Sequence, residues 1–381
     1  MPAPLALLDV LAQVPDPRKR RGIRHPLSAI LAMTVLAMLT GAKGLTAIAQ
    51  FGRDKGFPLA HALGFRRGKT PTKSTLSEIF RILDIDIFEA ELSRWIASRL
   101  PPGEELVISL DGKAQRGSKD GEAPGQHLVS AYVAQAKAVL AQIRVDAKTN
   151  EHKAALQLLG ILPVAGNIFV GDAMFCQRDV CAKIIEGGGD YIFFVKDNQP
   201  SLAVEAWVTT RKHGRSRPLF PPDDLPASSP PRTASQTNKG HGRLEKRTLQ
   251  TTSTLTKYQE WAGLKQGFEL TRERTIKGVK TVETVRGITS LTADRADARR
   301  LLELTRGHWA IENGLHYRRD VTMGEDASRV RKGTAPQVLA ALRNTIIHVA
   351  DEISPNLAAT FRRLSNCFHQ ALSFLRLPQP E

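Results

Sequence analysis

Two apolar runs in this chain each end in an aspartate, and that repeated pattern limits the folds that the chain can adopt. Residues 106–110 are followed by Asp111, and residues 168–171 are followed by Asp172. Short apolar runs of this kind indicate buried strands, so two strands are expected to deliver a carboxylate each at their C-terminal ends. A third carboxylate, Glu312, lies among aromatic and basic residues in a segment that is predicted to be a helix.

Three carboxylates from separate elements favour a divalent metal site. Mg²⁺ prefers a few carboxylate ligands and leaves its other positions to water and substrate phosphates. Such a site can activate water or a hydroxyl group and can stabilise the charge that develops when a phosphodiester is cleaved. A single aspartate after a strand is more commonly a turn or capping residue, and it is the repeated context that favours phosphoryl transfer.

The chain is strongly basic, with 54 Lys and Arg residues against 38 Asp and Glu residues and a formal net charge of +16. An excess of this size, with arginines that cluster locally, is typical of proteins that bind polyanions. Nucleic acid is the first expectation for the partner, and an anionic membrane surface is the second. A basic protein without such a partner is the alternative.

The cysteines and the one long apolar run indicate a reducing compartment and no membrane span. Cys176, Cys181 and Cys367 give neither an even set nor a Cys-x-x-Cys pair, which disfavours a disulfide framework and a structural zinc site. The apolar run 27–42 is shorter than the roughly 20 residues that a membrane span needs. It also lies too far along the chain for a secretory signal, so we expect a buried helix.

The order of the predicted elements indicates an α/β (α+β) chain with a ribonuclease H-like core. Residues 1–100 show helical patterns, and Pro101, Pro102 and Gly103 mark a domain boundary. Strands are predicted at 106–110, 127–133, 138–145, 168–171 and 191–195, with helices at 154–162 and 178–186. Three strands followed by a helix, a strand, a helix and a strand is the order of a ribonuclease H-like core.

A β-rich insertion is predicted at about 205–290, inside a catalytic domain at 101–350. It would begin with an extended Pro- and Ser-rich excursion at 213–240. Strand-like segments follow at 243–252, 268–276 and 281–289, with Lys277 and Gly278 as a hairpin turn. Helical periodicity returns at 294–317 and 335–349, and residues 351–381 are predicted to be a helical tail.

Motifs spread over nearly the whole chain form a co-linear set. They are DPRKRRG at 16–22, PTKST at 71–75, LDGKAQRGS at 110–118, GDAMFCQ at 171–177, GGDY at 188–191, KDNQP at 196–200 and RGHWAIEN at 306–313, followed by Leu315-His316, Asp320-Val321 and Glu325-Asp326. This set resembles insertion-sequence transposases of the ISAs, or H-repeat-associated, family in the DDE superfamily.

The resemblance implies a ribonuclease H-like domain in which an acidic triad binds divalent metal and cuts and joins DNA. Carried over to this chain, the triad is Asp111, Asp172 and Glu312, with Mg²⁺ as the metal and Mn²⁺ able to substitute. Asp320 lies eight residues after Glu312 and is the rival for the third position. Phe175 stands where members of the family usually have His, and a Tyr stands at 317 where Trp is common.

The resemblance also implies the partners. They are double-stranded DNA at terminal inverted repeats, target DNA, and a second copy of the chain in a synaptic complex. Residues 1–100 would be a transposase-associated DNA-binding domain, and the protein is expected in the bacterial cytoplasm at the nucleoid. The alternatives are a DNA-binding relic that has lost cutting, and a general metal-dependent nuclease without strand transfer.

Basic and aromatic residues around these motifs are candidate DNA contacts. They are Lys113, Arg116, Lys196, Arg306, His308, Trp309 and Arg319, together with Arg18, Lys19, Arg20 and Arg21. Guanidinium forks and ammonium charges suit phosphate oxygens, and an indole ring can stack on an unpaired base. The alternatives are a core position for Trp309, a solvated helix face at His308 and Arg319, and a solvated turn at 18–21.

Overall fold

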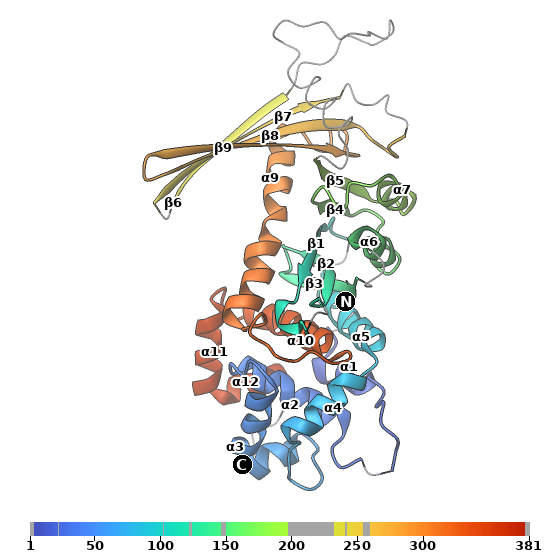
Figure 1. Ribbon diagram of the computed structural model, residues 1–381, viewed down its shortest axis with the longest axis vertical. Coiled ribbons are helices and arrows are strands. Elements are labelled where there is room, and N and C mark those ends of the chain that lie inside the picture. The colour runs from blue at the N-terminus through green and yellow to red at the C-terminus, as the bar shows by residue number, and fades with distance from the viewer. Residues whose placement is uncertain are drawn as a thin grey trace, which may run out of the picture. The chain divides into compact units, whose positions relative to one another are not determined.

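The computed structural model describes residues 4–21, 23–101, 103–121, 124–145, 150–196, 232–240, 242–253 and 260–377. The chain forms two compact units (Figure 1). The helical unit comprises Met1–Glu104, Gly112–Asp146 and Ile311–Glu381, and the sheet unit comprises Glu105–Asp111 and Ala147–Ala310. Each unit combines segments that are distant in the sequence. The domain boundaries predicted near residues 100 and 350 stay a prediction.

The helical unit brings helices from both ends of the chain together. Its N-terminal helices are α1 (Leu7–Gln13), α2 (Leu27–Leu39), α3 (Leu45–Ala62), α4 (Lys73–Ile82) and α5 (Ile85–Ala97), and its C-terminal helices are α10 (Ala335–Asp351), α11 (Leu357–Asn366) and α12 (Phe368–Phe374). Helix α10 contacts α2, α4 and α5, while α11 and α12 both contact α2. The blue and red helices of Figure 1 therefore pack against one another.

Helix α2 is buried almost completely because nearly all of its side chains are apolar. Twelve of its 13 residues are buried. A helix that is apolar on every side needs neighbours on every side, and α1, α3, α10, α11 and α12 all contact it. The predicted buried helix is therefore confirmed. Within the described part of the chain, no helix combines the length and the apolar character that crossing a membrane requires.

Glu89 on α5 is a half-buried residue of the helical unit with a hydrogen-bonded carboxyl group. Its Oε1 accepts hydrogen bonds from the side-chain amides of Gln142 on β3 (Ala138–Arg144) at 2.7 Å and of Gln337 on α10 at 3.1 Å. Burial raises the pKa of Glu89 to about 8, and these two hydrogen bonds offset the rise only in part. The folded protein therefore holds a proton on Glu89 at neutral pH.

Stability is expected to fall as the pH rises through the titration of Glu89. Its folded pKa lies above its ordinary value of 4.5, so the stabilisation is complete below that value and is lost as the pH rises towards 8. The slope is at most about 1.4 kcal/mol per pH unit. Glu89→Gln keeps an acceptor oxygen and removes the titration, so the variant should exceed the wild type in stability at about pH 8 but not at about pH 5. Urea unfolding at both pH values checks this, and an unchanged pH dependence would contradict it.

The sheet unit contains the parallel strands of the core. Strand β1 (Val107–Ala114) pairs in parallel with β4 (Ile168–Gly171), which pairs in parallel with β5 (Asp190–Val195). Helix α6 (Glu151–Leu159) precedes β4 in the chain, and helix α7 (Arg178–Glu186) connects β4 to β5. Strand β1 ends in the helical unit, where β2 (His127–Val133) pairs antiparallel with β3. The resulting order β3-β2-β1-β4-β5 confirms the predicted ribonuclease H-like α/β fold.

A four-stranded antiparallel sheet extends the sheet unit beyond β5. Its strands are β9 (Val279–Thr289), β8 (Gln266–Ile276), β7 (Arg243–Thr252) and β6 (Arg232–Gly240), in that order outward from β5. Lys277 and Gly278 form the β8–β9 turn with φ values of 48° and 82°, the positive values that a tight two-residue hairpin requires. The predicted β insertion and its hairpin are confirmed for the described residues.

Strand β6 corrects one prediction. Residues 213–240 were expected to form an extended excursion, but residues 232–240 pair with β7 along their whole length. Their side chains are mostly polar and largely exposed, so no apolar alternation marked the strand. Residues 213–231 lie outside the described residues.

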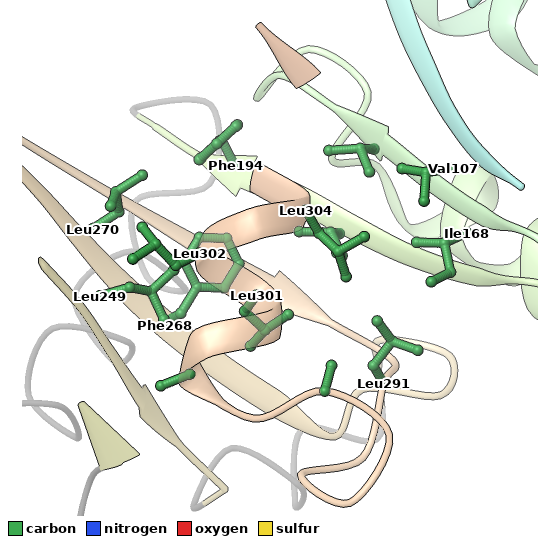
Figure 2. Packing of buried hydrophobic residues seen from close by; sticks show 14 residues of the cluster. Val107, Ile168, Phe194, Leu249, Phe268, Leu270, Leu291, Leu301, Leu302 and Leu304 are labelled. Carbon is green, nitrogen blue, oxygen red and sulfur yellow. The ribbon is translucent and has the colours of Figure 1, made fainter. Parts of the chain in front are cut away.

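Helix α9 (Ala298–His308) covers one face of this four-stranded sheet. Its Leu301 and Leu302 pack in one hydrophobic cluster with Leu249, Phe268 and Leu270 of β7 and β8 (Figure 2). The helix predicted at 294–317 begins later than expected, because Asp297 caps it by accepting the N–H of Arg300 at 2.8 Å. Two π-helical turns, η3 (Glu312–His316) and η4 (Arg318–Thr322), follow in the helical unit.

Candidate active site

The pairing of β1 with β4 brings Asp111 and Asp172 to neighbouring positions in the sheet unit. Leu110 pairs with Gly171, and each aspartate is the next residue of its chain segment. Paired strands are about 4.8 Å apart, so the two backbone positions are close. Asp172 follows the last residue of β4, as predicted. Asp111 instead lies inside β1, which continues to Ala114 after its pairing with β4 has ended.

Asp172 has an environment that favours a bound cation. Its side chain is half-buried, and its Oδ1 accepts the N–H of Met174 at 3.0 Å. Burial raises the pKa of Asp172, and the carboxylate of Glu151 acts in the same direction, while Lys196 opposes the shift. A carboxylate that is costly to ionise gains stability from a positive charge beside it.

Glu312 and His316 form a group of metal-type donors in the helical unit. They lie on the π-helical turn η3, with 3.6 Å between Glu312 Oε2 and His316 Nδ1. The Glu312 side chain is 56% exposed, whereas His316 is buried. Burial lowers the pKa of His316, as do Arg319 and Lys113, which favours the neutral imidazole that metals bind. A carboxylate and a neutral imidazole at this spacing can hold a divalent cation. His316 had no predicted role, although its position four residues after Glu312 was visible in the sequence.

Asp320, the rival for the third carboxylate, already has a cationic partner. Lys113 Nζ lies 2.6 Å from Asp320 Oδ2, and the lysine side chain is 9% exposed. An ion pair this close occupies one carboxylate oxygen and holds the lysine inside the unit. Lys113 was predicted to contact phosphate, and in this arrangement its charge is directed to Asp320.

Arg319 is fully buried in the helical unit, where it pairs with Glu325. Its Nε and Nη2 donate to the two carboxylate oxygens of Glu325 at 2.8 and 2.9 Å, and Arg343 donates to Glu325 at 3.1 Å. Burial alone would raise the pKa of Glu325, but the two guanidinium groups outweigh it and lower the pKa to about 2. The predicted contact of Arg319 with phosphate stays a prediction, and this burial argues against it.

Most of the other predicted DNA contacts are exposed. Arg116 on the 3₁₀ turn η1 (Arg116–Ser118), Lys196 directly after β5, and Arg306 near the end of α9 all lie at the surface. In the basic turn at 18–21, residues 19–21 are exposed. Arg18 instead forms an ion pair with Asp16, with 2.8 Å between Nε and Oδ1.

His308 and Trp309 are adjacent in sequence but have different surroundings. His308 is buried, and its ring centroid lies 6.2 Å from that of Phe194. Trp309 is 47% exposed, and the guanidinium of Arg272 lies 4.5 Å from the centroid of its ring. A core position for Trp309 is therefore excluded, and its ring is accessible from solvent.

Phe175, which stands where the resemblance implies a histidine, is a packing residue. It is fully buried, and a Cβ atom added at Gly171 would lie 3.0 Å from its Cδ2. The ring thus packs on the backbone just before Asp172, and a side chain at 171 would require this ring to shift by a few tenths of an ångström.

Comparisons with known proteins agree on the family. A family model described as "Transposase DDE domain" matches residues 82–349, and one described as "DDE_Tnp_1-associated" matches residues 8–96. The "Putative transposase YncI" of Escherichia coli O157:H7 is 32% identical over 351 residues, which is 90% of this chain and 87% of that protein. The "H repeat-associated putative transposase YhhI" of Escherichia coli (strain K12) is 31% identical and covers 90% of this chain and 89% of its own length.

A solved structure, the cryo-EM synaptic complex of piggyBac transposase with hairpin DNA, aligns with 97% of this chain and 76% of its own. The TM-score is 0.43 and the identity is 10%, so nothing about this chain follows from that similarity. The DDE-domain match covers more than half of the chain, and the two relatives span most of it. The chain therefore belongs to the DDE transposase family and, within it, to the H-repeat-associated insertion-sequence transposases.

Proposed function

We propose that this transposase binds terminal inverted repeats and cuts and joins DNA there, with Asp111, Asp172 and Glu312 as its metal-binding carboxylates. The observation that carries the proposal is the register of β1 and β4, which makes Asp111 and Asp172 neighbours. Glu312 is the third member because it is exposed beside His316, whereas Asp320 is paired with Lys113.

The donor set suits a hard divalent cation. Carboxylate oxygens are the ligands that Mg²⁺ and Mn²⁺ prefer, and the raised pKa of Asp172 is the shift that a cation would reverse. When bound, the metal would supply an activated oxygen nucleophile at neutral pH and positive charge at the phosphate.

The proposed reaction has two steps at phosphorus. In the first, a water oxygen attacks the phosphorus at the element end, the bond to the 3′ oxygen breaks, and that oxygen takes a proton. The products are a 3′-hydroxyl and a 5′-phosphate. In the second, the 3′-hydroxyl oxygen attacks a phosphorus in target DNA and displaces a target 3′ oxygen, so one phosphodiester forms as one breaks. The exposed side chains of Arg116, Lys196 and Arg306 would hold the phosphates during both steps.

Cleavage of DNA by the purified protein tests the proposal. The substrate is a labelled duplex with the terminal repeat and its flanking sequence, and the control is the same duplex with the repeat scrambled. We expect a nick at the repeat end with Mg²⁺ or Mn²⁺, none with EDTA, and joining of the freed end to a target plasmid.

Each alternative has its own outcome in the same experiment. Cutting of both duplexes without joining would indicate a general nuclease. Repeat-specific binding without cutting in either metal would indicate a DNA-binding relic. The proposal also includes a synaptic complex of two copies, which light scattering of the protein with repeat DNA would detect as two chains per particle.

A further inference from the structure

One face of the four-stranded sheet carries a group of arginines outside the predicted site. We call Arg243 and Arg247 of β7 and Arg272 and Arg274 of β8 the arginine face. Arg247 pairs with Arg272, and Glu245 pairs with Arg274. Cross-strand partners share a face and every second residue returns to it, so these side chains lie on the same side of the sheet as the residues that pack against α9. On this side of the sheet, the arginine face therefore adjoins the hydrophobic cluster that Figure 2 shows.

The arginine face has more positive than negative charge. Three arginines of this face form ion pairs with the carboxylate of Glu245. The nitrogen–oxygen distances are 2.6 Å for Arg247, 3.1 Å for Arg274 and 3.8 Å for Arg243. Glu283 lies 3.4 Å from Arg272. Four guanidinium groups therefore face two carboxylates among these residues, which leaves an excess of two positive charges. The direct pairing of Arg247 with Arg272 places like charges opposite each other, which destabilises a sheet, and the carboxylates of Glu245 and Glu283 lie beside these two arginines.

An exposed aromatic ring borders this charge. Trp309 directly follows α9 and stacks with Arg272 at 4.5 Å, yet 47% of the residue is exposed. Arg243 and Arg274 are also open, with side chains 47% and 53% exposed. Arginines that follow a phosphate backbone, together with an aromatic ring that accepts a base, are the two components of a surface that binds single-stranded nucleic acid.

We propose that the arginine face and Trp309 bind single-stranded DNA, with Arg243 and Arg274 on the phosphates and Trp309 stacked on an unpaired base. The inference rests on the proposed function only for the choice of DNA over RNA. It adds a second DNA-binding surface to the protein, built within the sheet unit and without any of the three carboxylates.

Binding of a fluorescent oligo(dT) of about 20 nucleotides to the full chain, followed by anisotropy without metal, tests the proposal. The double variant Arg243→Ala/Arg274→Ala should weaken binding at least about tenfold. It should also reduce the slope of log K against log salt by about 1.4, which is the value for two lost phosphate contacts on a single strand. Trp309→Ala should weaken binding roughly fivefold to hundredfold, while Trp309→Phe should restore most of the loss.

The matched control is Lys246→Ala/Lys280→Ala. These lysines lie on β7 and β9, at positions that alternate with those of the arginine face and so belong to the opposite side of the sheet. The control removes the same charge and should change the affinity less than about twofold. Equal weakening by both double variants would show a general charge effect and would overturn the proposal.

Three further outcomes would also overturn it. They are an unchanged affinity in Trp309→Ala, an equal loss for a duplex of the same length in that variant, and tighter binding of the matching RNA. The readout needs neither cleavage nor terminal repeats. Failure of the proposed function would therefore appear in the cleavage assay alone, and failure of this inference in the oligo(dT) assay alone.

Discussion

Replacing Asp172 with asparagine is expected to reduce repeat-end cleavage at least about a thousandfold while repeat binding is retained. The substitution keeps the shape of the side chain and removes the negative charge that would hold the metal. Loss of several kcal/mol of stabilisation at the phosphate corresponds to this factor, because each 1.36 kcal/mol is a tenfold change in rate. Single-turnover cleavage, with binding measured separately by anisotropy, checks the prediction, and Asp111→Asn should behave in the same way.

A matched aspartate on the same unit serves as the control. Asp179 lies on α7, its side chain is 54% exposed, and it pairs with His152 at 2.7 Å. Asp179→Asn removes the same charge close in sequence to Asp172 and should leave the cleavage rate within about twofold, since exposed pairs contribute little. A comparable loss in this variant would mean that net charge, and not the carboxylate at 172, governs cleavage.

The choice between Glu312 and Asp320 follows from the same assay. Glu312→Gln should match the loss in Asp172→Asn, because the substitution removes the charge of a carboxylate that is 56% exposed and lies 3.6 Å from the imidazole of His316. Asp320→Asn should lower the rate less and should destabilise the fold instead, because Lys113 would lose its partner at 2.6 Å. The reverse order would make Asp320 the third ligand.

The second large effect is expected at Glu325, which is 2% exposed and joins Arg319 to Arg343. Glu325→Gln removes the carboxylate charge to which two buried guanidinium groups donate. Removing one partner from a buried ion-pair group costs roughly 3–5 kcal/mol. We therefore expect a fall in Tm of about 4–6 °C, measured by thermal unfolding.

An exposed pair in the same unit provides the comparison. Glu91 and Arg94 form an ion pair one turn apart on α5, and Glu91→Gln should cost less than about 1 kcal/mol.

The pH dependence gives a second test at Glu325. Its folded pKa lies below the ordinary 4.5, so its stabilisation is present above that value and is lost as the pH falls towards about 2. The advantage of the wild type over Glu325→Gln should shrink over the same range, and a constant difference would contradict the assignment.

Local patterns in the sequence were enough to predict most elements of the core. Strands β4 and β5 and helix α7 lie where their apolar patterns placed them, because such periodicity depends on a few successive residues. Strand β6 could not be predicted in this way. Its side chains are mostly polar and exposed, and its conformation depends on the hydrogen bonds that it forms with β7.

The sequence by itself determined the family, the core strands and the candidate carboxylates Asp111, Asp172 and Glu312, since each depends on a residue and its near neighbours. Only the tertiary structure decided which charges neutralise one another. Lys113 and Asp320 pair across 207 residues of sequence, and Arg319 is buried on Glu325 instead of lying at the surface. The arginine face also depends on the register of β7 and β8, which places its side chains on one side of the sheet. The physical reason is that backbone conformation responds to local propensity, whereas the partner of a charged side chain depends on contacts between residues that are distant in the sequence.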